Sequence, residues 1–336
     1  MQAAAIIGFD TAIGWSGIII ALAALSAVLM ALSLRAAQGR HLAPVALLAI
    51  LSILLSAPLS RIIHWYCNTG SYPSLAAALT NPAIGGQAPV GVFAGTLLAT
   101  LLLWALRVYK DLGGMLDCLA PAAALGMAAG RLSCLFSTMN RGKFVLASPA
   151  LHRLPFTVAT ASASGETEWR IATFFWESMA AFAIFVVLLL FFLITRRRRS
   201  REDGDVFLLF LSLYGASHIV LESMRYDGLF LRSNGFVSLP QICCAVVLFL
   251  VAILLSVRVL RRSGFRLRHG VYWLVFLLGA GGAGYMEYYV QRHGNLFVKA
   301  YSIMSLCFVA MLVVIFLLLR ESRRRENPKG GPRHAG

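Results

Sequence analysis

Charged residues are scarce in this sequence, and acidic residues are scarcer than basic ones. Of 336 residues only 13% carry a formal charge, and 14 are Asp or Glu against 30 Lys or Arg. A soluble globular domain is about 25% charged and about 45–50% apolar, whereas 59% of this chain is hydrophobic. This composition excludes soluble enzyme folds and indicates a protein that crosses a membrane several times.

The hydrophobic residues are gathered in blocks of about 20 residues, long enough to cross a hydrocarbon core of roughly 30 Å. We therefore predict an all-α polytopic membrane helix bundle. Two thirds of the basic residues fall on one side if the N-terminus lies outside, as the positive-inside rule requires, so the net charge of +16 reflects topology rather than a nucleic-acid partner. The predicted spans are 12–34, 42–60, 88–106, 115–136, 174–195, 206–224, 237–257, 271–290 and 300–319.

Several other features are missing from the chain. The six cysteines show no metal-ligand spacing, so no metal site is expected. No internal repeat is visible, which weighs against the inverted-repeat transporters. No Lys or Arg precedes Arg35, so the first block lacks the basic start of a signal peptide and is predicted to be a true span.

The order of spans and loops predicts three parts. Residues 1–260 form a seven-span core with two long outer loops, 61–87 and 137–173, the second rich in turn-forming residues. Residues 261–320 follow an Arg-rich stretch and form an appended two-span hairpin. The tail 321–336, rich in Arg, Gly and Pro, is predicted to be disordered on the inner, cytoplasmic side, which places the C-terminus inside.

Ionisable residues within predicted spans are costly in hydrocarbon and are therefore candidates for function. Arg131 lies 17 residues into the fourth span, about 25 Å at 1.5 Å per residue. Glu222 lies at a similar depth in the sixth span, and Glu177 lies one turn inside the outer end of the fifth. The three residues are thus expected at one level in the outer leaflet.

In the sixth span, His218, Glu222 and Arg225 are spaced to share one helix face. A guanidinium group suits a lipid phosphate, and an imidazole suits proton transfer near neutral pH. These residues predict an outer-leaflet site for an anionic phospholipid or another anionic amphiphile. A structural ion pair between His218 and Glu222 is the alternative.

The motifs in these spans resemble the signature of the prolipoprotein diacylglyceryl transferases, over about residues 10–260. The resemblance covers the first, fourth, fifth, sixth and seventh spans in order. The matching residues are Trp15 and Gly17, Asp117 to Pro121, Gly130-Arg131-Leu132 with Gly142, Phe175-Trp176-Glu177, Tyr214-Gly215, Glu222, Arg225, and Ser238-Leu-Pro-Gln241.

The resemblance implies a seven-span enzyme of the bacterial cytoplasmic membrane. Such an enzyme moves the diacylglyceryl group of phosphatidylglycerol onto the lipobox cysteine of preprolipoproteins, releases glycerol phosphate and needs no cofactor. Its partners are phosphatidylglycerol, the lipobox signal peptides and the bilayer. The phospholipid-binding positions carried over are Arg131, Cys134, Gly142, Glu177 and Arg225.

This chain differs from the family pattern at four positions. Val90 stands where the family has its catalytic histidine, Cys134 replaces an Asn, His218 replaces an arginine, and Ser16 replaces a Tyr. Because valine cannot carry a proton, the expected catalytic pair here is His218 with Glu222. The alternatives are a catalytically silent lipid- or lipopeptide-binding paralogue and a small transporter.

Overall fold

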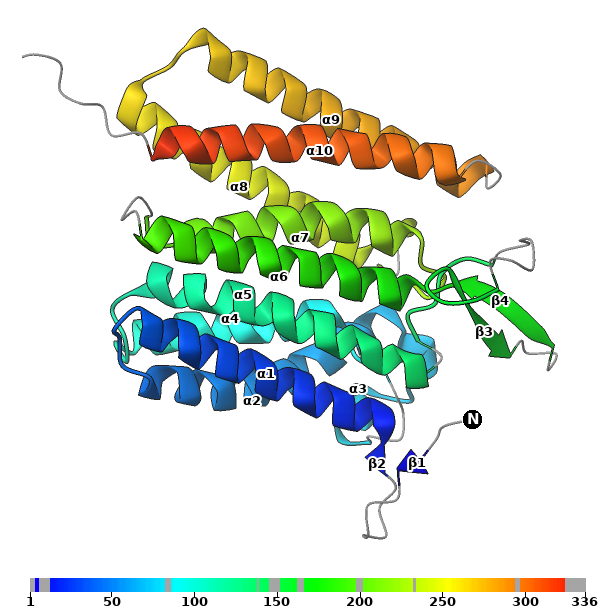
Figure 1. Ribbon diagram of the computed structural model, residues 1–336. Helices are drawn as coiled ribbons and strands as arrows, with labels where there is room; N and C mark the ends of the chain where they lie inside the picture. Colours follow the sequence, from blue (N-terminus) through cyan, green and yellow to red (C-terminus); the bar gives the residue numbers. More distant parts are fainter. Residues whose placement is uncertain are drawn as a thin grey trace, which may run out of the picture.

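The computed structural model describes residues 4–5, 13–81, 86–137, 139–144, 152–161, 166–197, 202–231, 234–293 and 297–323. Long, side-by-side helices make up most of this part of the chain (Figure 1), which confirms the predicted all-α bundle. They are α1 Trp15–Ala37, α2 Ala43–Cys67, α4 Pro89–Ala105, α5 Leu112–Arg131, α6 Thr173–Arg197, α7 Asp205–Ser223, α8 Leu239–Ser263, α9 Leu267–His293 and α10 Phe297–Ser322.

Seven helices of the described chain are long and apolar enough to cross a membrane: α1, α2, α5, α6, α7, α8 and α10. The other two predicted spans are also helices. Helix α4 is apolar but has 17 residues, which reach about 26 Å at 1.5 Å per residue. Helix α9 has 27 residues but is less apolar, since its sequence contains several glycines and Glu287.

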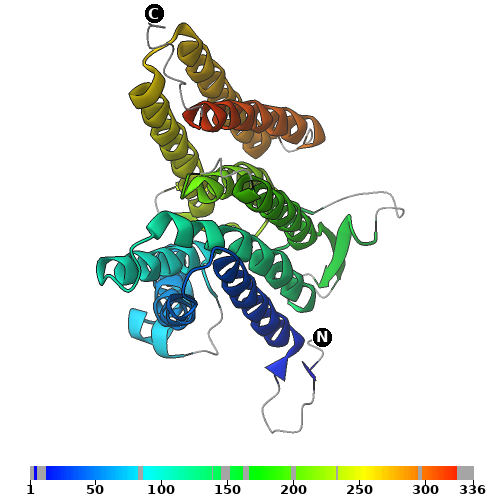
Figure 2. The same ribbon diagram turned by 60° about the vertical axis from the view of Figure 1, so that its left-hand side comes forward.

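The helices form a layered bundle (Figure 1). Helices α1, α2, α4 and α5 lie on one side, α6 and α7 occupy the centre, and α8 leads to the α9–α10 hairpin on the other side. The turned view shows the hairpin well separated from α1 and α2 (Figure 2). The centre is closed by fully buried aliphatic side chains such as Leu188, Val206 and Leu255, whose close packing stabilises helix association inside a bilayer.

Glycine allows α4 to lie directly against α2. A Cβ on Gly91 would come within 2.4 Å of the Cα of Ser60, and a Cβ on Gly95 within 2.5 Å of the Cα of Ser56. Ser60 also donates a hydrogen bond from its hydroxyl to the carbonyl of Ala88. Small residues at both sides of a contact let two membrane helices approach closely, so α2 and α4 form a tight pair.

The end of the bundle predicted to face outward carries the short elements. They are β1 Ala4–Ala5, β2 Ile13–Gly14, the 3-10 helix η1 Thr69–Ser71, α3 Leu75–Thr80, the 3-10 helix η2 Leu132–Phe136, β3 Thr157–Ala161, β4 Thr167–Ile171, β5 Phe230–Leu231 and β6 Asn234–Ser238. Strands β3 and β4 form an antiparallel hairpin that projects from this end (Figure 1). The outer loop 137–173 thus holds regular structure that turn composition did not predict.

The opposite end is held by buried charges. Asp117 of α5 is fully buried and accepts hydrogen bonds from the amides of Gly204, Val206 and Phe207, at the start of α7. Asp205 pairs with Arg258 of α8 at 3.1 Å and with Arg323 at 2.8 Å. These contacts fix α7 to α5, α8 and the end of α10.

The predicted tail begins later than residue 321. Glu321 and Ser322 form the last turn of α10, and the Glu321 carboxylate lies 2.9 Å from the ring of His269 in α9. The remaining tail, 324–336, lies outside the described residues.

Candidate functional site

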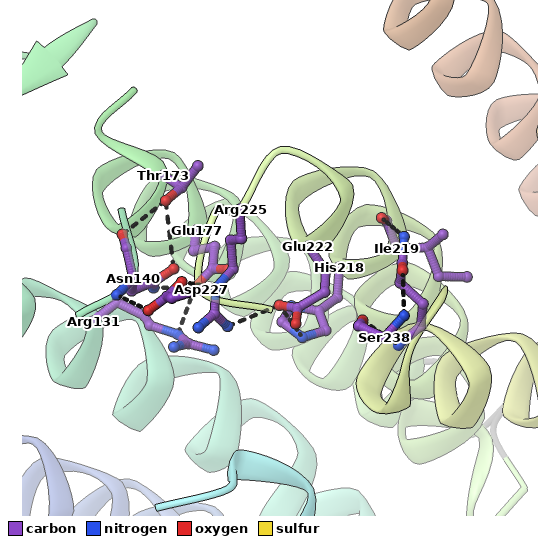
Figure 3. Close-up of polar contacts among 11 residues, drawn as sticks. Arg131, Asn140, Thr173, Glu177, His218, Ile219, Glu222, Arg225, Asp227 and Ser238 are labelled. Carbon is purple, nitrogen blue, oxygen red and sulfur yellow. Dashed lines mark hydrogen bonds and ion pairs between the residues drawn. The ribbon is translucent and has the colours of Figure 1, made fainter. Parts of the chain in front are cut away.

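Three helices bring the predicted site residues to one level near the outer end of the bundle. Arg131 ends α5, Glu177 lies in the second turn of α6, and His218 and Glu222 lie in the last two turns of α7. Helix α5 runs in the same direction as α7 and opposite to α6, so residues from these particular turns meet. Their side chains point toward one another in the interior of the bundle (Figure 3).

Arg131 and Glu177 form the first buried pair. The Nε of Arg131 lies 2.7 Å from Oε2 of Glu177, and the same oxygen accepts a 2.7 Å hydrogen bond from the side-chain amide (Nδ2) of Asn140. Asn140 is held in turn because its carbonyl accepts a 2.7 Å bond from the hydroxyl of Thr173. The carboxylate of Glu177 is therefore fixed by two donors from outside its own helix.

Glu222 and Arg225 form the second pair. Nη1 of Arg225 lies 2.8 Å from Oε2 of Glu222, and its Nε lies 3.0 Å from the carboxylate of Asp227. The other oxygen of Asp227 accepts a 2.6 Å bond from the backbone amide of Asn140. Asn140 thereby links the two pairs into one network (Figure 3).

His218 lies at the inner edge of this network. Its ring stacks on Tyr214 with centroids 4.9 Å apart, and its Nε2 lies 3.8 Å from Oε2 of Glu222. The distance is too long for a hydrogen bond. The stack holds the imidazole in place, so a small movement of either side chain would bring it within bonding distance of Glu222.

Gly142 and Cys134 lie beside the network. Gly142 forms a strand-like bridge with Arg225, and its amide donates a 2.8 Å bond to the carbonyl of Ile171. A Cβ on Gly142 would come within 2.5 Å of the Cβ of Ile171, so glycine is required for this close approach. Cys134, in η2, is a half-buried free cysteine.

A small pocket opens next to the network. Its polar lining consists of Arg131, Glu177, Tyr214, Ser217 and His218, and apolar residues of α5, α6 and α7 complete it. Glu222 and Arg225 do not line it, although the sequence predicts Glu222 at the same level as Arg131 and Glu177. They lie behind it as buried members of the network, because they bond to each other and to Asp227.

Sequence reasoning missed Asn140, Thr173 and Asp227. Asn140 and Asp227 each lie two residues from a predicted site residue, Gly142 and Arg225. Asn140 also adopts a left-handed backbone (φ 57°), which Asn tolerates better than most residues. An Asn two residues before a predicted site glycine is only a weak sign of a functional residue. The pairing of Asn140 with Asp227 spans 87 residues, so no local sequence pattern could reveal it.

Val90 lies in the first turn of α4. One turn further on, the ring of Phe93 lies 5.3 Å from that of Tyr214, which stacks on His218. The position at which the resemblance expects a histidine therefore lies on a helix that contacts the site.

Glu177, His218 and Glu222 are the described residues whose geometry could hold a metal ion, since one ligand atom of each lies within 4.8 Å of the others. Metal bonds of about 2.0–2.2 Å would require all three to move inward. Both carboxylates are already paired with guanidinium groups, so a divalent cation would lie beside two positive charges. The arrangement fits an ionic network better than a metal centre.

Comparison with known proteins identifies the family. The family described as prolipoprotein diacylglyceryl transferase matches residues 3–283. The chain belongs to this family. The match extends into α9, beyond the residues 10–260 indicated by the motifs. Together with the apolar helices, it shows a multi-span membrane protein of a bacterial diacylglyceryl transferase family.

Several relatives carry the name phosphatidylglycerol–prolipoprotein diacylglyceryl transferase. One from Streptococcus equi subsp. zooepidemicus is 30% identical over 163 residues, 47% of this chain and 60% of the relative. One from Dehalococcoides mccartyi is 28% identical over 209 residues, which are 60% of this chain and 74% of the relative. One from Bacillus licheniformis is 27% identical over 252 residues, which are 74% of this chain and 88% of the relative. The chain thus spans about 60% of the length of the first of these relatives.

Proposed function

We propose that this protein transfers the diacylglyceryl group of phosphatidylglycerol to the lipobox cysteine of preprolipoproteins, at the outer leaflet of the bacterial cytoplasmic membrane. The observation that supports this most is the buried network in which Arg131–Glu177 and Arg225–Glu222 meet beside a pocket. Buried charges are expensive in a bilayer, so two ion pairs held together at one level of the bundle support a functional site.

The reaction requires a thiol to displace a phosphate ester. The cysteine sulfur of the peptide attacks a glycerol carbon of the lipid, the carbon–oxygen bond to phosphate breaks, and glycerol phosphate leaves with the bonding electrons. The thiol proton must go to a base, since the thiolate is the nucleophile. His218 is the imidazole in the pocket lining and is proposed for this role, with Glu222 orienting it once the two side chains come within hydrogen-bond distance.

The phospholipid-binding roles of Arg131, Cys134, Gly142, Glu177 and Arg225 belong to the same proposal. Arg131 lines the pocket while its Nε is bound by Glu177, so the end of its guanidinium group is available to a headgroup. Cys134 follows Arg131 by one turn, and Gly142 holds the segment that contacts Arg225. The proposal includes an outside N-terminus and a cytoplasmic C-terminus, as the distribution of basic residues predicts.

Transfer of labelled diacylglyceryl from phosphatidylglycerol vesicles to a synthetic lipobox peptide tests the proposal directly. The purified full chain should label the peptide on its cysteine, and a matched peptide with serine in place of cysteine should stay unlabelled. Growth of a transferase-depleted bacterium carrying this chain gives an independent test. Failure in both experiments would refute the transferase activity.

The second candidate is a silent lipid- or lipopeptide-binding paralogue. Val90 and His218 favour it, because two groups that the resemblance assigns to catalysis and binding are replaced. Under this alternative the chain would bind phosphatidylglycerol or the lipobox peptide and transfer nothing. The same labelling experiment, combined with a binding measurement, separates the two candidates.

A further inference from the structure

Arg141 differs from the other buried arginines in having no acidic partner. Among the described residues, Arg35 and Arg141 are the most buried arginines, at 3% and 5% exposure. Arg35 pairs with Asp111 at 3.1 Å, whereas no carboxylate of the described residues lies within ion-pair distance of Arg141. Arg131 and Arg225, on either side of the network, each hold a carboxylate.

Most hydrogen-bond donors of Arg141 are unused. Its Nη2 donates a 2.7 Å bond to the carbonyl of Ser137, while Nε and Nη1 are buried and have no partner within the described chain. Guanidinium carries five N–H donors and always keeps its charge. Leaving such a group buried and unpaired is costly, so this position is suited to an acceptor-rich anion supplied from outside the chain.

The side chain of Arg141 is also held in a defined orientation. Its guanidinium carbon lies 4.8 Å from the ring centroid of Phe174, which is 1% exposed. Its carbonyl accepts a 3.0 Å bond from the amide of Tyr226, and the following amide, of Gly142, donates to Ile171. Because the side chain and backbone are both fixed before a ligand arrives, little conformational entropy is lost on binding.

The position of Arg141 relates it to the site already described. Asn140, the residue before it, joins the two ion pairs, and Gly142, the residue after it, bridges to Arg225. Arg141 itself does not line the pocket of Arg131 and Glu177. It therefore lies outside that pocket, while its two chain neighbours contact the network.

We propose that Arg141 binds a phosphate group through the free N–H groups of its guanidinium, forming a second anion subsite beside the pocket. Ser137 accepts from one N–H of Nη2, and the other N–H of Nη2 forms a fork with Nη1 that matches two phosphate oxygens. This inference rests on the proposed function, which brings two phosphates to this level of the membrane: the phosphodiester of the lipid and the phosphomonoester of the glycerol phosphate that leaves. The first would make Arg141 a substrate-binding residue and the second a product-binding residue.

Binding measurements on the purified full chain in detergent test this inference without requiring transfer. The probes are short-chain phosphatidylglycerol, glycerol phosphate and a short-chain diacylglycerol that lacks phosphate. Arg141→Gln should weaken binding of at least one phosphate probe about 10- to 100-fold, as expected for a lost hydrogen bond to a charged group. Diacylglycerol binding should stay within about twofold, because it has no group for the guanidinium.

Two further variants control for charge and folding. Arg141→Lys keeps the charge but loses the fork, so it should fold and still weaken phosphate binding. Arg153→Gln removes an exposed cation from the same outer segment and should leave binding unchanged. Loss confined to phosphatidylglycerol would identify the lipid as the source, and loss confined to glycerol phosphate would identify the product.

Unchanged phosphate binding in Arg141→Gln, or a loss equal for phosphate probes and diacylglycerol, would overturn the inference. Absence of phosphate binding in the wild type would do so as well. Phosphate binding that depends on Arg141 in a protein that transfers nothing would refute the proposed function and leave the inference intact. The two failures are therefore distinguishable.

Discussion

Glu177 and Glu222 each keep one carboxylate oxygen, Oε1, buried and without a hydrogen-bond partner within the described chain. The other oxygen of each is held by an arginine at 2.7 or 2.8 Å. An unused buried acceptor is costly unless a ligand or water supplies a donor. We therefore expect these two oxygens to accept from a substrate hydroxyl or thiol. A ring nitrogen of His218 lies within 4.8 Å of both carboxylates.

His218 allows the sharpest residue-scale prediction. His218→Gln should reduce diacylglyceryl transfer at least 100-fold, the lower range of a general acid–base contribution, because the amide keeps the shape but cannot take a proton. The labelling assay measures transfer, and thermal unfolding checks the fold. His41→Gln, at an exposed position between α1 and α2, at the other end of the bundle, is the control. Transfer at the wild-type rate in His218→Gln would contradict the assigned role.

Val90 provides the complementary prediction. Val90→His places an imidazole on α4, one turn from Phe93, which contacts Tyr214. We expect transfer to rise about tenfold or more, because a second group able to carry the proton is then present. The readout is the initial rate of peptide labelling. If neither the wild type nor Val90→His transfers the group, the silent-binding alternative is favoured.

At the scale of elements, buried polar caps decide how the helices join. The capping box at the start of α8, in which Ser238 and Gln241 satisfy each other's backbone amides, accounts for the Ser-Leu-Pro-Gln motif by helix initiation. Asp117, in the fourth-span motif, accepts three backbone amides at the start of α7. Part of the family signature therefore reflects helix placement, and the rest reflects the site.

Asp117→Asn should destabilise the contact between α5 and α7. Asparagine offers one acceptor oxygen where the carboxylate offers two, and it loses the favourable charge at the start of α7, so we expect a loss of about 2 kcal/mol or more in unfolding free energy. Thermal unfolding in detergent measures it. Glu166→Gln, at an exposed position, should have no measurable effect. Equal stability of Asp117→Asn and wild type would show that these bonds contribute nothing.

At the scale of the whole molecule, the α9–α10 hairpin is joined to the core at both ends. Near the outer end, the hydroxyl of Tyr301 in α10 donates a 3.0 Å bond to the carbonyl of Ser223, the residue after Glu222. At the other end, Arg323 pairs with Asp205. The hairpin therefore supports the full length of α7, the helix that carries His218 and Glu222.

The predicted topology rests on the distribution of charge and can be tested along the whole chain. Reporter fusions after residues 36, 110, 200 and 265 should all report the cytoplasm, because the adjoining segments carry most of the basic residues. Activity of a periplasmic reporter at any one of these positions would refute the scheme. A fusion after residue 72, beyond the end of α2, should report the outer face.

The sequence alone was sufficient to predict the helical segments and the level of the site. Hydrophobic blocks specify helices because the backbone must satisfy its own hydrogen bonds in a bilayer, and a fixed rise per residue converts position into depth. For the same reason Arg131, Glu177 and Glu222 could be placed together before any contact was known. The resemblance of the motifs indicated the prolipoprotein diacylglyceryl transferase family, and the comparison with known proteins confirms it.

Only the tertiary structure revealed how the charges are paired. Asn140 joins Glu177 and Asp227 across long stretches of sequence, and Arg141 is left with free donors because no acidic side chain reaches it. Such pairing depends on helix rotation and on the path of the outer loop, which hydropathy does not encode. The sequence therefore determined how deep each charge lies, and the packing of α5, α6 and α7 determined which charges meet, because rotation about a helix axis leaves depth unchanged.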